Sequence, residues 1–208
     1  MPDVRDNKTW KRINRILTVL LVLISLYLII NPFLPEVELI LARKKDSTQG
    51  FVYESSAAVH AGINKSLLKK IPRDNRIVIP AINVDAQVLE GNDVSILNYG
   101  QAWRRPFTSS PDKGGNTVIV GHRYFGRGKN TFYHLNKLKK GQEIIVFWEG
   151  QEYVYKINTV FETSPENIQV EDNTPQSILT IYTCSGLSAE KRLIVKADLT
   201  SRNLIGQL

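Results

Sequence analysis

The segment Ile178-Leu-Thr-Ile-Tyr-Thr-Cys184-Ser-Gly-Leu-Ser-Ala-Glu-Lys-Arg192-Leu-Ile-Val195 contains two apolar, β-branched runs separated by a short polar stretch. This pattern predicts two strands joined by a loop that begins at Ser185-Gly186. If the strands form an antiparallel hairpin, Cys184 and Arg192 lie opposite each other next to the loop, within side-chain reach. The thiol is then expected where a rigid strand gives way to a loop, which is a common setting for chemistry.

The region from residue 76 onward continues the strand pattern, with apolar and polar residues alternating in several short runs. Gly141 and Glu149-Gly150 are typical of hairpin turns, and single helical turns are expected near 94–97 and 131–135. About eight short strands with little helix predict a mostly β domain, either a closed barrel or a sandwich. The expected strands are 76–80, 81–89, 117–121, 143–148, 152–161, 178–183 and 193–198.

One histidine lies at another expected strand end. His122 follows the run 117–121 and enters a loop rich in Gly and Arg, but spacing along the chain does not place it beside Cys184. A thiolate can attack a peptide carbonyl, and an imidazole can donate a proton to the leaving amine. A guanidinium can hold the substrate backbone or offset oxyanion charge. Cys184, His122 and Arg192 are therefore the candidate catalytic residues.

Each of these residues also has a purely structural interpretation. A lone cysteine such as Cys184 is often a small buried apolar residue. His122 could be a structural histidine at a strand end, and Arg192 a solvated strand residue. In that case Arg104 or Arg105 would supply the guanidinium.

The roles of the other threonine, tyrosine and histidine candidates are predicted less directly. Thr183 is a candidate substrate-binding residue that orients the substrate or donates to the oxyanion, although β propensity alone would also explain it. Tyr182 is expected on the opposite face from Thr183. His134 stands among apolar and aromatic neighbours and is interpreted as a packing residue, whereas His60 is interpreted as a surface residue of a helix.

Composition excludes several classes of site. The 208-residue chain has one cysteine, so an intramolecular disulfide and a multi-cysteine zinc site are both excluded. The formal net charge is +7, but no dense basic stripe with interleaved aromatic residues indicates a nucleic-acid partner. Glu166, Glu171 and Asp172 have an unconvincing spacing for calcium, so they are expected in a solvated loop. We therefore expect no metal and no cofactor.

An uncharged apolar run covers residues 16–34. Nineteen residues at about 1.5 Å each span roughly 29 Å, close to the hydrocarbon thickness of a bilayer. Basic residues precede the run, and Glu36 and Glu38 follow it. The positive-inside rule therefore predicts a cytoplasmic N-terminus and a domain outside the membrane. A cleaved signal peptide is the alternative, but the run is longer than usual and no small-x-small site follows it closely.

The predicted organisation has four parts. Residues 1–15 are cytoplasmic, and residues 16–35 are a single-pass membrane helix. Residues 36–75 are an extracytoplasmic linker with a helix near 55–70, and residues 76–208 are the catalytic domain. The anchor makes the lipid bilayer a partner of the chain.

Four motifs resemble one known family. Thr180-Ile-Tyr-Thr-Cys184 resembles the TLxTC signature of sortases, the cell-wall cysteine transpeptidases, with Ile in place of Leu. Gly121-His122 is similar to the family's histidine motif, Arg192-Leu-Ile-Val195 to its arginine strand, and Ile79-Pro-Ala-Ile-Asn-Val84 to its opening strand. The resemblance covers roughly residues 76–200 and implies an eight-stranded, closed sortase barrel with catalytic His122, Cys184 and Arg192.

The resemblance also implies a reaction. A sortase cleaves the Thr–Gly bond of an LPxTG-like sorting signal on a surface protein and forms a thioacyl enzyme. An amine of a peptidoglycan precursor or of a pilin lysine then resolves this intermediate. No Asp-Pro-aromatic lid motif precedes the barrel, so a pilus-type lid is not indicated. Two alternatives remain: an inactive barrel that binds wall peptides, and a cysteine peptidase that only hydrolyses.

Overall fold

The structure is a computed structural model that describes residues 7–34, 36–37, 40–41, 72–99, 101–123, 131–186 and 188–204. The chain divides into two compact units, Met1–Lys45 and Asp46–Leu208, and each is described by itself. The helix expected near 55–70 lies outside the described residues. The boundaries of the four predicted parts stay predictions.

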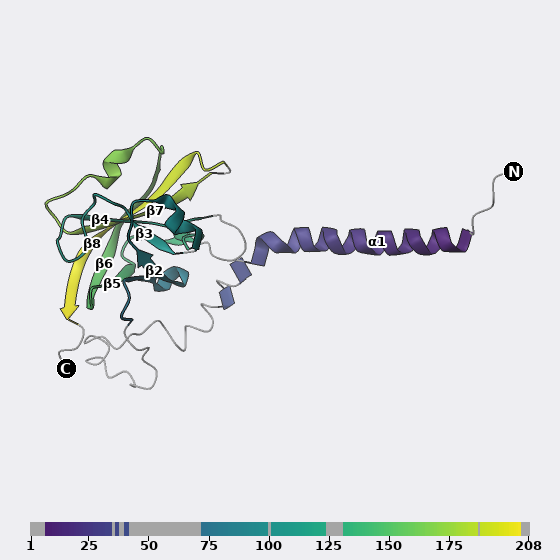
Figure 1. Ribbon diagram of the computed structural model, residues 1–208, viewed down its shortest axis with the longest axis horizontal. Coiled ribbons are helices and arrows are strands. Elements are labelled where there is room, and N and C mark those ends of the chain that lie inside the picture. Colours follow the sequence, from purple (N-terminus) through teal and green to yellow (C-terminus); the bar gives the residue numbers. More distant parts are fainter. Residues whose placement is uncertain are drawn as a thin grey trace, which may run out of the picture. The chain divides into compact units, whose positions relative to one another are not determined.

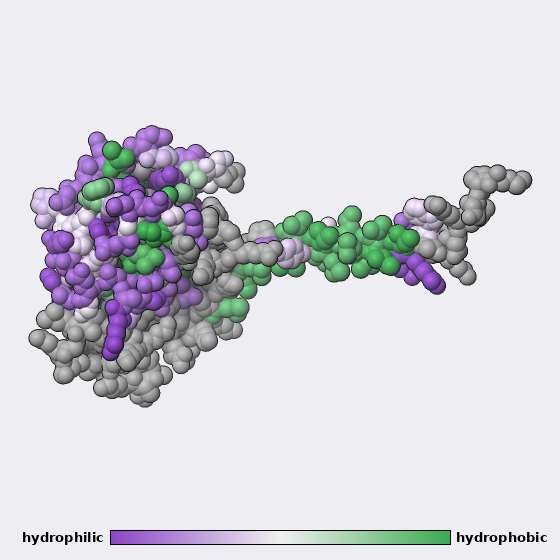
Figure 2. Space-filling model, in the orientation of Figure 1, coloured by the Kyte–Doolittle hydropathy of each residue, from purple (hydrophilic) through white to green (hydrophobic). Residues whose placement is uncertain are grey.

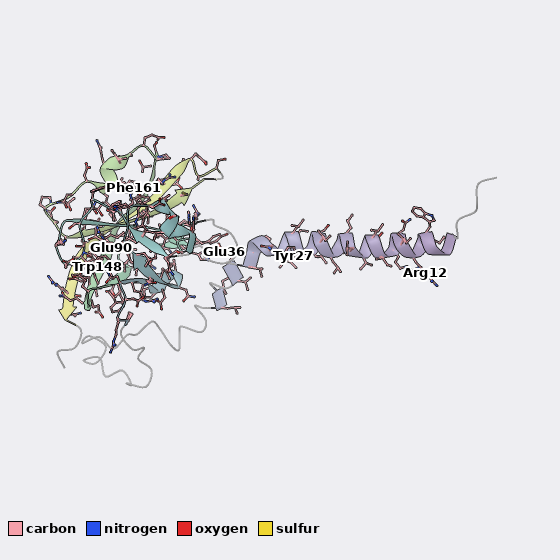
Figure 3. The ribbon with its side chains drawn as sticks, in the orientation of Figure 1. Arg12, Tyr27, Glu36, Glu90, Trp148 and Phe161 are labelled. Carbon is pink, nitrogen blue, oxygen red and sulfur yellow. The ribbon has the colours of Figure 1, made fainter. Side chains whose placement is uncertain are left out.

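The N-terminal unit is built on one long helix, α1 (Asn7–Ile30), followed by the 3-10 turn η1 (Asn31–Phe33) (Figure 1). The segment Trp10–Ile30 is long and apolar enough to cross a membrane, and Figure 2 shows its continuous hydrophobic surface. Trp10 and Tyr27 are exposed near its two ends, and Tyr27 is labelled in Figure 3. Both residue types are enriched at membrane interfaces.

The second unit contains a closed β-barrel, as the family resemblance predicted, and not a sandwich. Around the barrel the order is β1-β2-β3-β4-β7-β8-β6-β5 (Figure 1). Closure leaves no strand edge unpaired around the barrel. The strands are β1 (Arg76–Ile79), β2 (Val84–Leu89), β3 (Ala102–Arg104), β4 (Asn116–Val120), β5 (Glu143–Trp148), β6 (Gln151–Thr163), β7 (Ile178–Ser185) and β8 (Lys191–Leu204).

Two details differ from the sequence-based prediction. The expected strand 81–89 begins only at Val84, because Pro80–Ile82 forms the 3-10 turn η3. Proline has a fixed φ and no N–H, which suits the first position of such a turn. Strand β3 was not predicted, since three residues are too few to show a period. The other 3-10 helices are η4 (Val94–Tyr99), η5 (Leu135–Lys137) and η6 (Ile168–Glu171).

Alternation along β7 separates the two faces of the barrel wall. Leu179 and Ile181 point into the main core, whereas Tyr182 packs against a second apolar cluster on the outer face. Thr180 is on the same outer face as Tyr182 because side chains alternate along a strand. By the same alternation Thr183 and Ser185 face inward, and Cys184 faces outward.

Candidate active site

Cys184 lies between two partner segments on the outer face of the barrel. In the antiparallel pair of β7 and β8, the Cα of Cys184 is directly opposite that of Arg192. This confirms the pairing expected from the eight-residue spacing. Directly opposite residues project to the same face of a sheet, so the guanidinium of Arg192 originates beside the thiol. Cys184 is half-buried and free, so its sulfur can meet a substrate.

His122 approaches from the other side of Cys184. Strands β4 and β7 are parallel and in register up to Val120 opposite Tyr182. The amide of Gly121 then donates to the carbonyl of Tyr182 at 3.3 Å. Strand β4 ends at Val120, and extending its register by two residues would bring His122 level with Cys184, on the same face. Neighbouring strands lie about 4.8 Å apart, so this extension predicts that the imidazole and the thiol originate from adjacent positions.

Packing behind the histidine explains why a glycine precedes it. A Cβ at Gly121 would lie 2.7 Å from Cδ2 of Phe132, whose side chain is fully buried. The amide of Phe132 also donates to the carbonyl of His122 at 3.0 Å. The ring of Phe132 therefore requires a residue without a side chain at 121, and its backbone holds His122 at the end of β4.

The guanidinium of Arg192 is oriented by the loop that precedes it. Its Nη1 donates to the carbonyl of Ala189 at 3.0 Å and to that of Lys191 at 3.2 Å. Ala189 has a φ of 58°, an uncommon value for a residue with a side chain. The turn thus directs a carbonyl at the guanidinium and limits its freedom beside Cys184.

The two alternative arginines are engaged elsewhere. Arg104 is paired with Glu90 and donates to the carbonyl of Thr108 at 2.9 Å. The guanidinium of Arg105 lies 4.9 Å from the ring centroid of Trp103 and bonds Glu171 at 3.1 Å. Arg192 is therefore the arginine that the ladder places opposite the thiol.

Thr183 has a position that the sequence did not indicate. Its side chain is 2% exposed and its hydroxyl donates to the carbonyl of Gly121 at 2.8 Å. It faces the barrel interior, opposite to Cys184. This geometry favours a role in joining β7 to the end of β4, while its predicted contact with substrate stays untested.

A buried apolar cluster packs on the outer face of the barrel wall near Cys184. Its buried members come from β3, β4 and η4, and Tyr182 of β7 packs against them. Because Tyr182 is two residues from Cys184 on the same face, this cluster supports the end of β7 that carries the nucleophile. We call it the outer apolar cluster, and it consists of Leu97, Trp103, Val118 and Val120 with Ile96 and Tyr182 at its margin.

Glu171 corrects one sequence-based expectation, because it is not a solvated loop residue. Its carboxylate accepts a hydrogen bond from the hydroxyl of Tyr182 at 2.5 Å and pairs with Arg105 at 3.1 Å. Burial and the nearby Glu171 charge raise the pKa of Tyr182, so the phenol stays protonated as a donor. These contacts fix η6 beside the outer apolar cluster. No group of three or more metal-binding side chains occurs among the described residues.

A buried polar pair, Thr180 and Asn116, is bonded to the segment that contains η6. Thr180 donates from its hydroxyl to Oδ1 of Asn116 at 2.8 Å, and both residues are fully buried. Nδ2 of Asn116 donates to the carbonyls of Val170 and Asp172 at 3.0 and 2.9 Å. Asn116 was not predicted as a site residue, because the sequence shows it only beside two turn-forming glycines, directly before the apolar run 117–121.

His134 is not part of a strand and directly precedes η5. Its ring meets that of Tyr133 edge-on, with 4.8 Å between centroids. This agrees with its interpretation as a packing residue. His60 lies outside the described residues.

The pKa of the His122 imidazole leads to a testable prediction. Burial lowers the pKa of its imidazole, because desolvation disfavours the charged form. In a Cys184→Ala protein, where no thiolate can offset this effect, we expect His122 to titrate below its ordinary value of about 6.5. An NMR pH titration of the imidazole would measure it, with the urea-unfolded chain as reference. A midpoint at or above the unfolded value would contradict the expectation.

Comparisons with known proteins identify the family of this barrel. The family model of the sortase domain matches residues 77–200. Sortase A of Streptococcus agalactiae is 30% identical over 135 residues, which cover 62% of this chain and 53% of that protein. The chain thus spans about half the length of this curated relative.

Solved structures give the same result. A Clostridium perfringens sortase D5 transpeptidase is 29% identical with a TM-score of 0.55, over 62% of this chain and 79% of that one. Sortase A of Listeria monocytogenes, at 22% identity, shares the fold with a TM-score of 0.58, over 64% of this chain and 90% of that one. From the family match together with the closed barrel, we conclude that this chain belongs to the sortase family.

Proposed function

We propose that the chain is a membrane-anchored cysteine transpeptidase that acts on LPxTG-like sorting signals. The observation that supports the proposal is the strand pairing around Cys184. Cys184 on β7 lies opposite Arg192 of β8, and β7 pairs on its other side with β4, which ends two residues before His122. A thiol flanked by segments that carry an imidazole and a guanidinium suits attack on a peptide carbonyl.

The proposed reaction has two steps. The Cys184 thiolate attacks the carbonyl carbon of the Thr–Gly bond, and the guanidinium of Arg192 stabilises the oxyanion. The C–N bond breaks as imidazolium His122 gives its proton to the leaving amine, which leaves a thioester. An acceptor amine attacks the thioester and neutral His122 takes its proton. The thiolate departs, and a new amide is formed.

The active protonation state is expected to be sparse. An ordinary imidazole with a pKa of about 6.5 is about 24% imidazolium at pH 7. Burial lowers the pKa of His122 and reduces this fraction further. The proton donor for the leaving amine is therefore a minority form at neutral pH, and slow turnover follows.

The anchor completes the proposal. Helix α1 supplies a span of sufficient length, and the basic residues before it favour a cytoplasmic N-terminus. Surface proteins with sorting signals would then meet the barrel outside the membrane. The acceptor would be the amine of a peptidoglycan precursor or of a pilin lysine.

An acceptor experiment tests the function. The full chain in detergent is incubated with LPxTG-like peptides, with and without an amine such as triglycine, and the products are measured by mass spectrometry. We expect a thioacyl adduct on Cys184 and a ligated peptide that requires the amine. Hydrolysis with no ligated product would favour the peptidase alternative, and no adduct at all would favour the binding barrel.

Arg192→Ala is expected to lower kcat about 100-fold with a nearly unchanged Tm, because one oxyanion donor is lost from a partly exposed side chain. Arg192→Lys should recover only part of this loss, since an ammonium lacks the planar fork. Steady-state kinetics and thermal unfolding would measure both. An unchanged rate in Arg192→Ala would transfer the role to Arg104 or Arg105.

A further inference from the structure

Two side-chain hydrogen bonds join the segment at the end of β4 to β7. One involves the residues just before His122 and Cys184, and the other involves the residues just after them. In the first, Thr183 donates from Oγ1 to the carbonyl of Gly121 at 2.8 Å. In the second, Arg123 donates from Nη1 to Oγ of Ser185 at 3.1 Å. The residues of the second bond directly follow His122 and Cys184 in the chain. Any movement between Arg123 and Ser185 therefore moves the imidazole relative to the thiol.

The hydroxyl of Ser185 has a defined orientation. Ser185 is 2% exposed and donates to Oε1 of Glu162 at 2.5 Å. A hydroxyl has one proton, so the oxygen that accepts from Arg123 must use a lone pair. On the far side, Oε2 of Glu162 is 3.3 Å from Nζ of Lys191. Donors and acceptors thus alternate without conflict from the guanidinium through the hydroxyl to the carboxylate.

The charge of Glu162 is maintained at neutral pH. Its hydrogen bonds from Ser185 and Lys191 hold the pKa of the carboxyl below its ordinary value. The hydroxyl consequently has a charged acceptor, and hydrogen bonds to charged groups are stronger than neutral ones.

The side chains of Ser185 and Glu162 lie on the opposite face of the barrel wall from the Cys184 thiol. Ser185 is paired with Lys191, and Glu162 with Leu193, which belongs to the barrel core. Paired residues share a face, so these side chains project to the inner side of the wall. Cys184 projects to the outer side. A substrate bound at the thiol therefore meets the outer face, and these residues act through the backbone.

We propose that Arg123, Ser185 and Glu162 form a clamp that sets the distance between His122 and Cys184. The clamp is a positioning device for the catalytic pair, so it rests on the proposed function. Without the Ser185 hydroxyl, the segment that carries His122 loses the side-chain bond from Arg123 to β7. Misplacement of a catalytic group by about 1 Å can cost about 100-fold in rate.

The test uses a readout that needs no substrate. Cys184 is the single cysteine, so iodoacetamide labelling of the full chain in detergent reports on that thiolate alone. The labelling rate against pH is compared for the wild type, His122→Ala and Ser185→Ala. We expect the Ser185→Ala profile to shift from the wild-type profile toward that of His122→Ala. For peptide cleavage we expect kcat to fall about 10- to 100-fold, with KM nearly unchanged.

A second variant examines the bond from its other end. Arg123→Gln removes the guanidinium without changing Ser185 and should give the same shift. The double variant should lose little more than either single one, as expected for two partners of one interaction. Thr200→Ala is the matched control, because it removes a hydroxyl that donates to the carbonyl of Val154 at 2.9 Å, later in β8. Its profile should equal that of the wild type.

Each result decides the proposal. An unchanged profile in folded Ser185→Ala overturns the clamp, and if that variant does not fold, Arg123→Gln decides in its place. A wild-type profile equal to that of His122→Ala also overturns it, since no coupled pair exists to be held. A shifted profile in a chain that forms no acyl adduct with sorting peptides would support the clamp while the transpeptidase function fails.

Discussion

Replacing Cys184 with alanine is expected to abolish the thioacyl intermediate and to lower kcat by at least about 10⁴-fold. The chain has no other sulfhydryl, and no other described side chain is paired opposite Arg192 on β7. Loss of a covalent nucleophile removes both steps of the reaction at once. Intact-mass measurement after incubation with a sorting peptide should therefore show no adduct.

The fold should tolerate this change. Cys184 is half-buried at the outer face and is absent from the main core, so its truncation leaves the barrel packing intact. Thermal unfolding of the Cys184→Ala protein should therefore match the wild type within a few degrees. An acyl adduct on the alanine variant, or turnover within tenfold of the wild type, would show that the nucleophile lies elsewhere.

The second large effect is expected for His122→Ala. General acid–base catalysis contributes about 10²–10⁴-fold, and in the proposed reaction His122 serves both the leaving and the incoming amine. We expect kcat/KM to fall by at least about 10³-fold, with the loss present in acylation as well as in transfer. Single-turnover measurement of adduct formation would separate the two steps.

His134→Ala is the matched control for this change. It removes the other described imidazole, which contacts Tyr133 edge-on near η5, and it should leave the rate unchanged. Turnover like that of the wild type in His122→Ala would remove His122 from the mechanism. A strong loss in His134→Ala with a normal Tm would require a different proton donor.

Much of the site was predictable where the chemistry is local. The spacing of Cys184 and Arg192 predicted their pairing because a hairpin joins neighbouring strands through one short loop. The expected strand 143–148 matches β5, because a short run of β-branched and aromatic residues between turn-forming glycines indicates a buried strand. The family match over residues 77–200 confirms the family that the motifs predicted.

Other features could not be read from the chain. The level of His122 with Cys184 depends on the parallel pairing of β4 with β7, whose paired residues are more than 60 positions apart. Glu171 was expected in a solvated loop, yet it bonds Tyr182 and Arg105. No local pattern records such contacts, because their geometry exists only once the barrel has closed.

The sequence by itself determined the residue types available for chemistry, the strand-rich domain, the apolar N-terminal span and the hairpin that pairs the thiol with a guanidinium. These follow from periodicity, composition and short spacing. Tertiary structure alone decided that β4 pairs with β7, that Thr183 faces inward, and that Ser185 links Arg123 to Glu162. The reason is physical: the pairing of distant strands is set by the total burial of the closed barrel, to which every strand contributes.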